Sequence, residues 1–186
     1  SVLDENSNKD AAIVSTQRDL IAGEVSKDIA RRKLIPIDIL EAHDSGATHF
    51  HDMDYIIQPM FNCCLINLED MLTNGTVING KRIDTPKSFQ VACTVTTQII
   101  AQVASGQYGG QSINGIDRIL APFVRKSYEK ILNNVIEEQV EIYGMEPNME
   151  KAREIAWKRT RKEVKDGIQT IQYQINTLMT TNGQSP

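Results

Sequence analysis

The amino-acid sequence predicts a mainly α-helical fold with a few short strands. Four segments carry apolar residues at the three- and four-residue spacing of a buried helix face: residues 16–33, 85–105, 113–143 and 149–179. Residues 49–65 show no such spacing and contain Pro59, which interrupts a central strand. Asn79-Gly80 marks a tight hairpin turn between two short extended runs. Helices therefore dominate, and the strands are short.

Composition narrows the class of protein. The 186 residues suit one domain, and a net charge of -4 predicts no broad electrostatic footprint for nucleic acid. No apolar run approaches the ~20 residues of a membrane span, and no signal peptide is visible. Three cysteines without disulfide spacing fit a reducing compartment, so a cytoplasmic protein is expected. Both ends read as cut from a longer chain.

The first helix is expected over 16–33, with one apolar face formed by Leu20, Ile21, Val25 and Ile29. Pro36 fits the first turn of a short second helix, because its missing N–H is not needed there. We expect that helix to bury Ile37 and Leu40 and to stop at Gly46.

Residues 49–65 are predicted to be extended. Alternation would place His49, His51 and Met53 on one face of a strand. Residues 61–66 would form a short buried strand, followed by a short helix over 68–72. A hairpin over 77–83 would turn at Asn79-Gly80, which supplies the two positive φ angles of a type I′ turn.

The later helices have clearer limits. Thr85 is the predicted N-cap of the next helix, with Pro86 in its first turn. Its buried face would comprise Phe89, Ala92, Cys93, Thr96, Ile99, Ile100 and Val103. Pro122 should kink the long helix over 113–143 or mark its true first turn. The last helix carries a seam for a partner helix, in this chain or a second subunit: Val164, Ile168, Ile171, Ile175 and Leu178.

Candidate chemistry centres on the adjacent Cys63 and Cys64. Two buried packing thiols are the default interpretation, and a disulfide between neighbours would be strained. Alternation would let only one of the two face a cavity. His49 and His51, with Asp52 and Asp54, lack a placed third metal ligand, so a hydrogen-bonded structural role is favoured and no metal site is predicted.

The glycine-rich residues 106–112 precede a helix, so their N–H groups could hold a phosphate, although a plain turn is the default. These sequence patterns by themselves do not identify the reaction that the protein catalyses.

Six motifs, in this order, resemble the anaerobic (class III) ribonucleoside-triphosphate reductases. They are His49-Phe-His-Asp-Met-Asp-Tyr55, Asn62-Cys-Cys-Leu65, Thr85-Pro-Lys-Ser88, Gln102-Val-Ala-Ser105, Gln107-Tyr-Gly-Gly110 and Asn182-Gly-Gln-Ser-Pro186. The resemblance identifies residues 1–186 as the N-terminal portion of the catalytic barrel domain. The ATP-cone, the later barrel strands and the glycyl-radical loop with its zinc-binding cysteines are absent.

The resemblance implies a ten-stranded α/β barrel in the intact protein, the glycyl-radical enzyme fold. It implies reduction of ribonucleoside triphosphates to deoxyribonucleoside triphosphates, for DNA precursor synthesis. An iron–sulfur S-adenosylmethionine activating enzyme would generate the glycyl radical outside this chain. A cysteine beyond Pro186 would then become the thiyl radical, and formate is the expected reductant, with a thioredoxin-like donor left open.

The resemblance also assigns site residues. Cys63 maps to the second active-site thiol, and Cys64 is then a packing residue. Asn62, His49 and His51 are expected to line the substrate cavity.

In this family, early helices form a homodimer interface that carries a deoxynucleotide or ATP effector site. By position, Gln98, Lys130 and Asp84 match effector contacts, and an ordinary polar surface is the alternative.

Two rival hypotheses remain. The chain could belong to another glycyl-radical enzyme, such as a relative of the acyl-lyases, in which an adjacent cysteine pair carries radical chemistry. Alternatively, it could act as a non-catalytic helical dimerisation module. The isolated segment is expected to be inactive under the reductase hypothesis.

Overall fold

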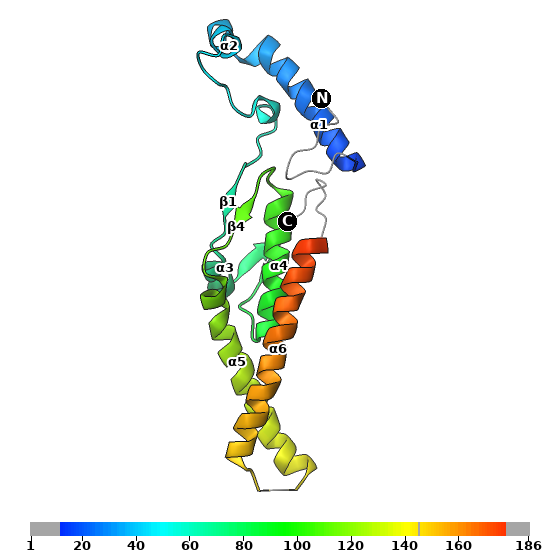
Figure 1. Cartoon of the computed structure of the whole chain (residues 1–186), viewed down its shortest axis with the longest axis vertical. Helices are drawn as coiled ribbons and strands as arrows, with labels where there is room; N and C mark the ends of the chain where they lie inside the picture. Colours follow the sequence, from blue (N-terminus) through cyan, green and yellow to red (C-terminus); the bar gives the residue numbers. More distant parts are fainter. Residues whose placement is uncertain (1–11, 145, 178–186) are drawn as a thin grey trace. The chain divides into compact units, whose positions relative to one another are not determined.

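The computed structural model describes residues 12–144 and 146–177, and these residues form two compact units. The first unit contains residues 12–64 and 104–110, and the second contains 65–103, 111–144 and 146–177. Helices dominate both units, and the strands span only two or three residues each (Figure 1), so the predicted mainly α fold is confirmed. None of the described helices is long and apolar enough to cross a membrane.

The first unit begins with α1 (Val14–Ile29), which continues into a π-helical turn, η1 (Ala30–Leu34). Helix α2 (Ile37–Asp44) follows Pro36, and Gly46 has a φ of 77° just beyond its end. Both features agree with the sequence prediction. A short 3₁₀ turn, η2 (Met53–Tyr55), then packs against α1. The small core of this unit consists of Ala30, Ile35, Leu40 and Met53.

The buried face of α1 is not the apolar face that the sequence predicts. The side chains of Ile21, Val25 and Ile29 are exposed, whereas Thr16 and Ser26 are buried. Small side chains occupy the buried face because the η2 turn packs closely against α1. The Ser26 hydroxyl donates a hydrogen bond to the Met53 carbonyl oxygen over 3.3 Å. Ile37 of α2 is also exposed, so only Leu40 of the predicted pair is buried.

The predicted strand alternation at His49, His51 and Met53 is wrong. His49 has no regular structure, His51 lies exposed in a turn, and Met53 is buried as the first residue of η2. Asp52 takes a left-handed conformation with a φ of 56°, which reverses the chain and ends any strand.

The strand predicted over 61–66 is shorter and more exposed than expected. Only β1 (Cys64–Leu65) forms, and Phe61 and Leu65 are 80% and 72% exposed.

In the second unit, α3 (Leu68–Asn74) leads into the hairpin of β2 (Thr76–Ile78) and β3 (Lys81–Ile83). Thr76 pairs with Ile83 and Ile78 pairs with Lys81 in an antiparallel register. Asn79 and Gly80 have φ angles of 50° and 73°, which confirms the predicted type I′ turn. The Asn79 N–H at the hairpin turn donates to the Gln102 side-chain oxygen over 3.0 Å, which joins the hairpin to the helix that follows it. Strand β4 (Gln111–Ser112) pairs with β1.

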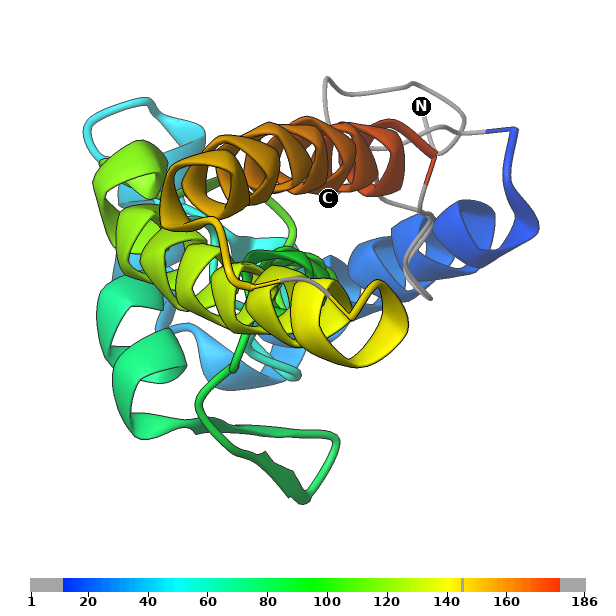
Figure 2. The ribbon, with the colours of Figure 1, turned by 90° about the horizontal axis from the view of Figure 1, so that it is seen from below.

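Three long helices form the body of the second unit (Figures 1 and 2): α4 (Phe89–Ser105), α5 (Ile116–Glu137) and α6 (Met149–Thr177). A second π-helical turn, η3 (Glu138–Ile142), extends α5. The predicted buried face of α4 is confirmed at six of its seven residues, since Phe89, Ala92, Cys93, Thr96, Ile99 and Ile100 are at most 6% exposed, whereas Val103 is half-buried. Its predicted start is wrong, since the helix begins at Phe89. Thr85 instead donates its hydroxyl to the Thr73 carbonyl oxygen over 2.7 Å.

Helices α5 and α6 also depart from the prediction in detail. Helix α5 begins at Ile116, so Pro122 lies inside it and does not mark its first turn. The predicted apolar seam of α6 is wrong at Ile168, which is 47% exposed. The buried residues of α6 are mostly small: Ala152, Ala156, Thr160, Gly167 and Ile171. Leu178 and the motif at 182–186 lie outside the described residues.

Candidate functional site

Cys63 lies in the first unit, outside regular secondary structure and immediately before β1. Its thiol is exposed and donates a hydrogen bond to the side-chain oxygen Oδ1 of Asn62 over 3.3 Å. Cys64 is half-buried, and its N–H donates to the Gly110 carbonyl oxygen over 3.2 Å. The two adjacent cysteines therefore differ in exposure, and Cys63 is the more accessible of the two.

The backbone around Asn62 and Cys63 is held by the loop of residues 106–110, which follows α4. Phe61 and Gln107 form a parallel bridge. The Tyr108 N–H donates to the Phe61 carbonyl oxygen over 3.1 Å, and the Gly109 N–H donates to the Asn62 carbonyl oxygen over 2.7 Å. Because these N–H groups already have partners, they do not form the phosphate cradle that the glycine-rich sequence suggests.

The Tyr108 side chain fastens this loop to the turn at Asp52. Its ring stacks on Tyr55 with centroids 4.3 Å apart and an interplanar angle of 9°, and its hydroxyl donates to the Asp52 carboxylate. Burial and the Asp52 hydrogen bond raise the pKa of Tyr108. Burial acts to raise the pKa of Asp52 as well, but hydrogen bonds from Tyr108 and His51 outweigh it and lower that pKa below its ordinary value.

The histidines that the resemblance assigns to the substrate cavity lie in the same unit as Cys63. The rings of His49 and His51 meet edge to face with centroids 5.5 Å apart. His51 Nδ1 lies 2.6 Å from the Asp52 carboxylate, and His43 Nδ1 accepts the Phe50 N–H over 3.2 Å. His51 is therefore engaged in local structure, in line with the hydrogen-bonded role predicted for it, and His43 also holds the backbone of this segment.

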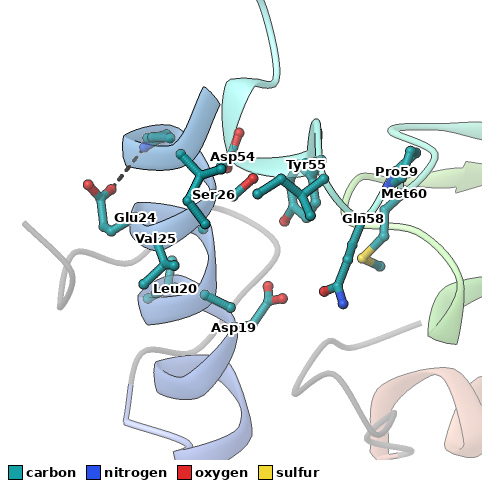
Figure 3. A pocket seen from close by; sticks show the side chains of 15 residues that line it. Asp19, Leu20, Glu24, Val25, Ser26, Asp54, Tyr55, Gln58, Pro59 and Met60 are labelled. Carbon is teal, nitrogen blue, oxygen red and sulfur yellow. Dashed lines mark hydrogen bonds and ion pairs between the residues drawn. The ribbon is translucent and has the colours of Figure 1, made fainter. Parts of the chain in front are cut away.

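A cavity of about 560 Å³ also lies in the first unit, between α1 and residues 54–60 (Figure 3). Asp19 of α1 and Gln58 of the opposite segment point into it. Its wall ends at Met60, so neither Asn62 nor Cys63 lines it. Within this unit, this cavity and the candidate thiol are therefore separate features.

Cys93 offers a contrast with Cys63. It lies fully buried on α4, and burial, with a smaller contribution from the nearby Glu163 charge, raises its pKa to about 12. A buried neutral thiol of this kind packs as an apolar group and is a poor nucleophile.

The residues matched to an effector site all lie in the second unit, and all three are exposed. Gln98 lies one turn before Gln102, whose side-chain oxygen accepts the Asn79 N–H of the hairpin over 3.0 Å. Asp84 follows the same hairpin, with its carboxylate 3.8 Å from the Arg82 guanidinium. Lys130 belongs to α5. Among the described residues, no hydrogen bond or ion pair joins Gln98, Asp84 and Lys130.

No group of three or more His, Cys, Asp or Glu side chains within residues 12–144 and 146–177 is arranged to hold a metal ion.

Two residues near the thiol, Tyr108 and Gly109, were not identified as site residues from the sequence. Both belong to the motif Gln107-Tyr-Gly-Gly110, which carries part of the family resemblance. The spacing of that motif gives no sign that it pairs with residues 61–64, more than forty positions earlier.

Comparison with known proteins gives a consistent result along the chain. The sequence profile of the anaerobic ribonucleoside-triphosphate reductases matches residues 5–186. The chain is 48% identical to the anaerobic ribonucleoside-triphosphate reductases of Salmonella typhimurium and of Escherichia coli K12, over all of its own length and 25% of theirs. It is 42% identical to the enterobacteria phage T4 reductase, and covers 29% of that protein.

The chain thus spans about a quarter of the length of these relatives. The match extends through the Asn62-Cys63 segment and through the loop that holds it. On this basis, the chain belongs to the anaerobic ribonucleoside-triphosphate reductase family.

Proposed function

We propose that the complete protein containing this chain reduces ribonucleoside triphosphates to deoxyribonucleoside triphosphates in the anaerobic cytoplasm, with Cys63 as an active-site thiol. The observation that carries the proposal is the family match over residues 5–186, which includes a cysteine whose thiol is exposed and oriented. The rival hypotheses, an acyl-lyase-like enzyme and a dimerisation module, gain no support from the three relatives described above.

In the proposed reaction, the Cys63 thiol gives a proton to the departing 2′ hydroxyl group. The carbon–oxygen bond at the 2′ position breaks, and the oxygen leaves as water. The two electrons would come from formate, which is oxidised to carbon dioxide. A glycyl radical in a part of the protein outside this chain, made by an iron–sulfur S-adenosylmethionine activase, would start the reaction through a second cysteine. That cysteine would take the 3′ hydrogen atom of the ribose and return it at the end, so no net oxidant is consumed. An exposed thiol held by Asn62 suits proton donation in a fixed direction.

The finer assignments are also proposals. His49 and His51 would lie beside the ribose, Asn62 would hold the Cys63 thiol there, and Gln98, Lys130 and Asp84 would contact a deoxynucleotide or ATP effector at a homodimer interface. In the complete protein, residues 1–186 would form the first part of a ten-stranded α/β barrel. Support comes from position in the family and from the exposure of Gln98, Lys130 and Asp84.

The test compares Cys63→Ser with Cys64→Ser in the complete reductase, activated without oxygen. We expect Cys63→Ser to abolish formate-dependent reduction of a ribonucleoside triphosphate while the glycyl radical still forms. Cys64→Ser should retain turnover, because the half-buried thiol has no chemical role in the proposal. Full activity in both variants would overturn the assignment of Cys63.

A further inference from the structure

Gly109 passes so close to Asn62 that no side chain fits at position 109. A Cβ atom built there would lie 2.2 Å from the Asn62 side-chain oxygen Oδ1 and 2.3 Å from the Asn62 carbonyl oxygen. Real Cβ atoms essentially never approach that closely. The φ angle of Gly109 is not positive, so the glycine is needed for space and not for its backbone conformation.

Both oxygens of Asn62 take part in this contact. The carbonyl oxygen accepts the Gly109 N–H over 2.7 Å, and the side-chain oxygen accepts the Cys63 thiol hydrogen over 3.3 Å. Asn62 therefore connects the loop directly to the thiol. If the side-chain oxygen were displaced, the thiol would lose its acceptor.

The loop cannot easily retreat from Asn62, because Tyr108 anchors it immediately before Gly109. Immediately after Gly109, the Gly110 carbonyl oxygen accepts the Cys64 N–H over 3.2 Å. The Gln107 side chain is 2% exposed, and its amide nitrogen donates to the Gly109 carbonyl oxygen over 3.2 Å. Tyr108 stacks on Tyr55 and bonds to Asp52. A side chain added at position 109 would therefore push Asn62 and not the loop.

We propose that Gly109 and Asn62 are positioning residues for the Cys63 thiol. The Asn62 side-chain oxygen accepts the thiol hydrogen and so fixes the rotamer of Cys63 until the 2′ hydroxyl replaces it as acceptor, and Gly109 provides the space that lets Asn62 do so. The proposal rests on the proposed role of Cys63 in ribonucleotide reduction. It assigns Asn62 to the thiol and not to the substrate, so its loss affects the rate of the chemical step rather than substrate binding.

Gly109→Ala and Gly110→Ala form a matched pair for the test in the complete, activated reductase. A Cβ atom at Gly110 meets nothing within 4 Å. We expect Gly109→Ala to lower kcat about 100-fold, the order of loss that follows a displacement of about 1 Å in a catalytic group. The KM for the ribonucleoside triphosphate and the glycyl radical content, measured by electron paramagnetic resonance, should stay within twofold. Gly110→Ala should match wild type.

Asn62→Leu and Asn62→Asp decide the matter if Gly109→Ala does not fold. Leucine has a similar size but no acceptor oxygen, so kcat should fall in Asn62→Leu while KM stays unchanged. Aspartate keeps an acceptor oxygen, so Asn62→Asp should retain part of the wild-type kcat. A raised KM with unchanged kcat in Asn62→Leu would overturn the proposal, because it would make Asn62 a substrate contact. A kcat within twofold of wild type in Gly109→Ala would also overturn it.

The Cys63→Ser variant distinguishes failure of the positioning proposal from failure of the proposed function. If Cys63→Ser is inactive while Gly109→Ala and Asn62→Leu are fully active, the positioning proposal fails and the proposed function stands. If Cys63→Ser keeps full turnover, the proposed function itself fails.

Discussion

The Ser127 hydroxyl donates a hydrogen bond to the Glu163 carboxylate over 2.9 Å and joins α5 to α6. The same two side chains cap α4. The Ser127 oxygen accepts the Phe89 N–H over 2.8 Å, and the Glu163 carboxylate accepts the Gln90 N–H over 3.1 Å. The first N–H groups of a helix have no partner within it, so two other helices supply the cap for α4.

Removal of the Glu163 carboxylate should destabilise the second unit. Glu163→Ala leaves the Gln90 N–H and the Ser127 hydroxyl without their acceptor, and we expect the free energy of unfolding in urea to fall by about 1–3 kcal/mol. Glu154→Ala is the control, because Glu154 lies exposed on the same helix. Equal losses in the two variants would contradict a capping role for Glu163.

Gly167 should not tolerate a methyl group. A Cβ atom there would lie 2.7 Å from a Phe89 ring carbon and 2.9 Å from the Cys93 sulfur. Overpacking costs about 1–3 kcal/mol, whereas alanine improves a helix over glycine by only about 1 kcal/mol. We therefore expect Gly167→Ala to lower the urea-unfolding free energy.

Gly23→Ala is the comparison for Gly167→Ala, since Gly23 also lies inside a helix and its nearest contact is the Asp54 Cβ at 3.2 Å. It should cost less. A stabilised Gly167→Ala would show that α4 and α6 are less tightly packed than described.

The start of α4 shows what local sequence can and cannot predict. Thr85-Pro86 is a good helix start by local rules, yet the helix begins at Phe89, where Ser127 and Glu163 provide acceptors from 38 and 73 residues away. The Asn79-Gly80 turn was predicted correctly because its two positive φ angles depend only on the two residues themselves. The predicted face of α4 was largely correct because apolar spacing detects side chains that pack on a neighbouring helix, as Phe89 and Cys93 do against Gly167 of α6.

The errors on α1 and α6 share one physical cause. Both helices bury small side chains, such as Ser26 and Gly167, where another segment approaches closely. Apolar periodicity cannot detect such contacts. Gly109 was missed at the candidate site for the same reason, since its importance comes from Asn62 in a distant segment. Cys63 was identified from the family motif and not from periodicity.

Cys93 should make the folded chain sensitive to alkali. Its pKa is raised from 9.0 to about 12, mainly by burial, so the folded state keeps a proton that the unfolded state releases. Its contribution to stability is complete below about pH 9 and is lost as the pH rises toward 12. Cys93→Ala removes this contribution, so the difference in unfolding free energy between wild type and variant should shrink between pH 9 and 12. A constant difference would contradict the prediction.

Thiol labelling gives a separate prediction. Iodoacetamide should alkylate the exposed Cys63 in the folded chain and reach the buried Cys93 only after unfolding in urea. Mass spectrometry of digested samples identifies the modified cysteine. Modification of Cys93 at the same rate in both states would show that the interface of α4 with its neighbours opens readily.

The Tyr108–Asp52 hydrogen bond should stabilise the first unit across a defined pH range. The pKa of Asp52 is lowered from 3.8, so its stabilising contribution is present above about pH 4 and is lost as the pH falls through the lower, folded-state value. The pKa of Tyr108 is raised from 10.0, so its contribution is present below about pH 10 and declines at higher pH.

Tyr108→Phe keeps the ring that stacks on Tyr55 and removes only the hydroxyl. The variant should therefore lose about 1 kcal/mol of unfolding free energy between about pH 4 and 10, a modest loss because the bond is partly exposed to solvent. The loss should be smaller outside that range, where Asp52 is protonated or Tyr108 is ionised.

Tyr173→Phe is the matched control, since the Tyr173 hydroxyl accepts only an exposed hydrogen bond from Gln169 on the same helix. It should change stability little at any pH. A loss in Tyr108→Phe that is the same at pH 3 and pH 7 would mean that the hydroxyl stabilises the loop without help from the Asp52 charge. The negative carboxylate would then not be what fastens residues 106–110, and with them the backbone of Asn62 and Cys63, to the turn at Asp52.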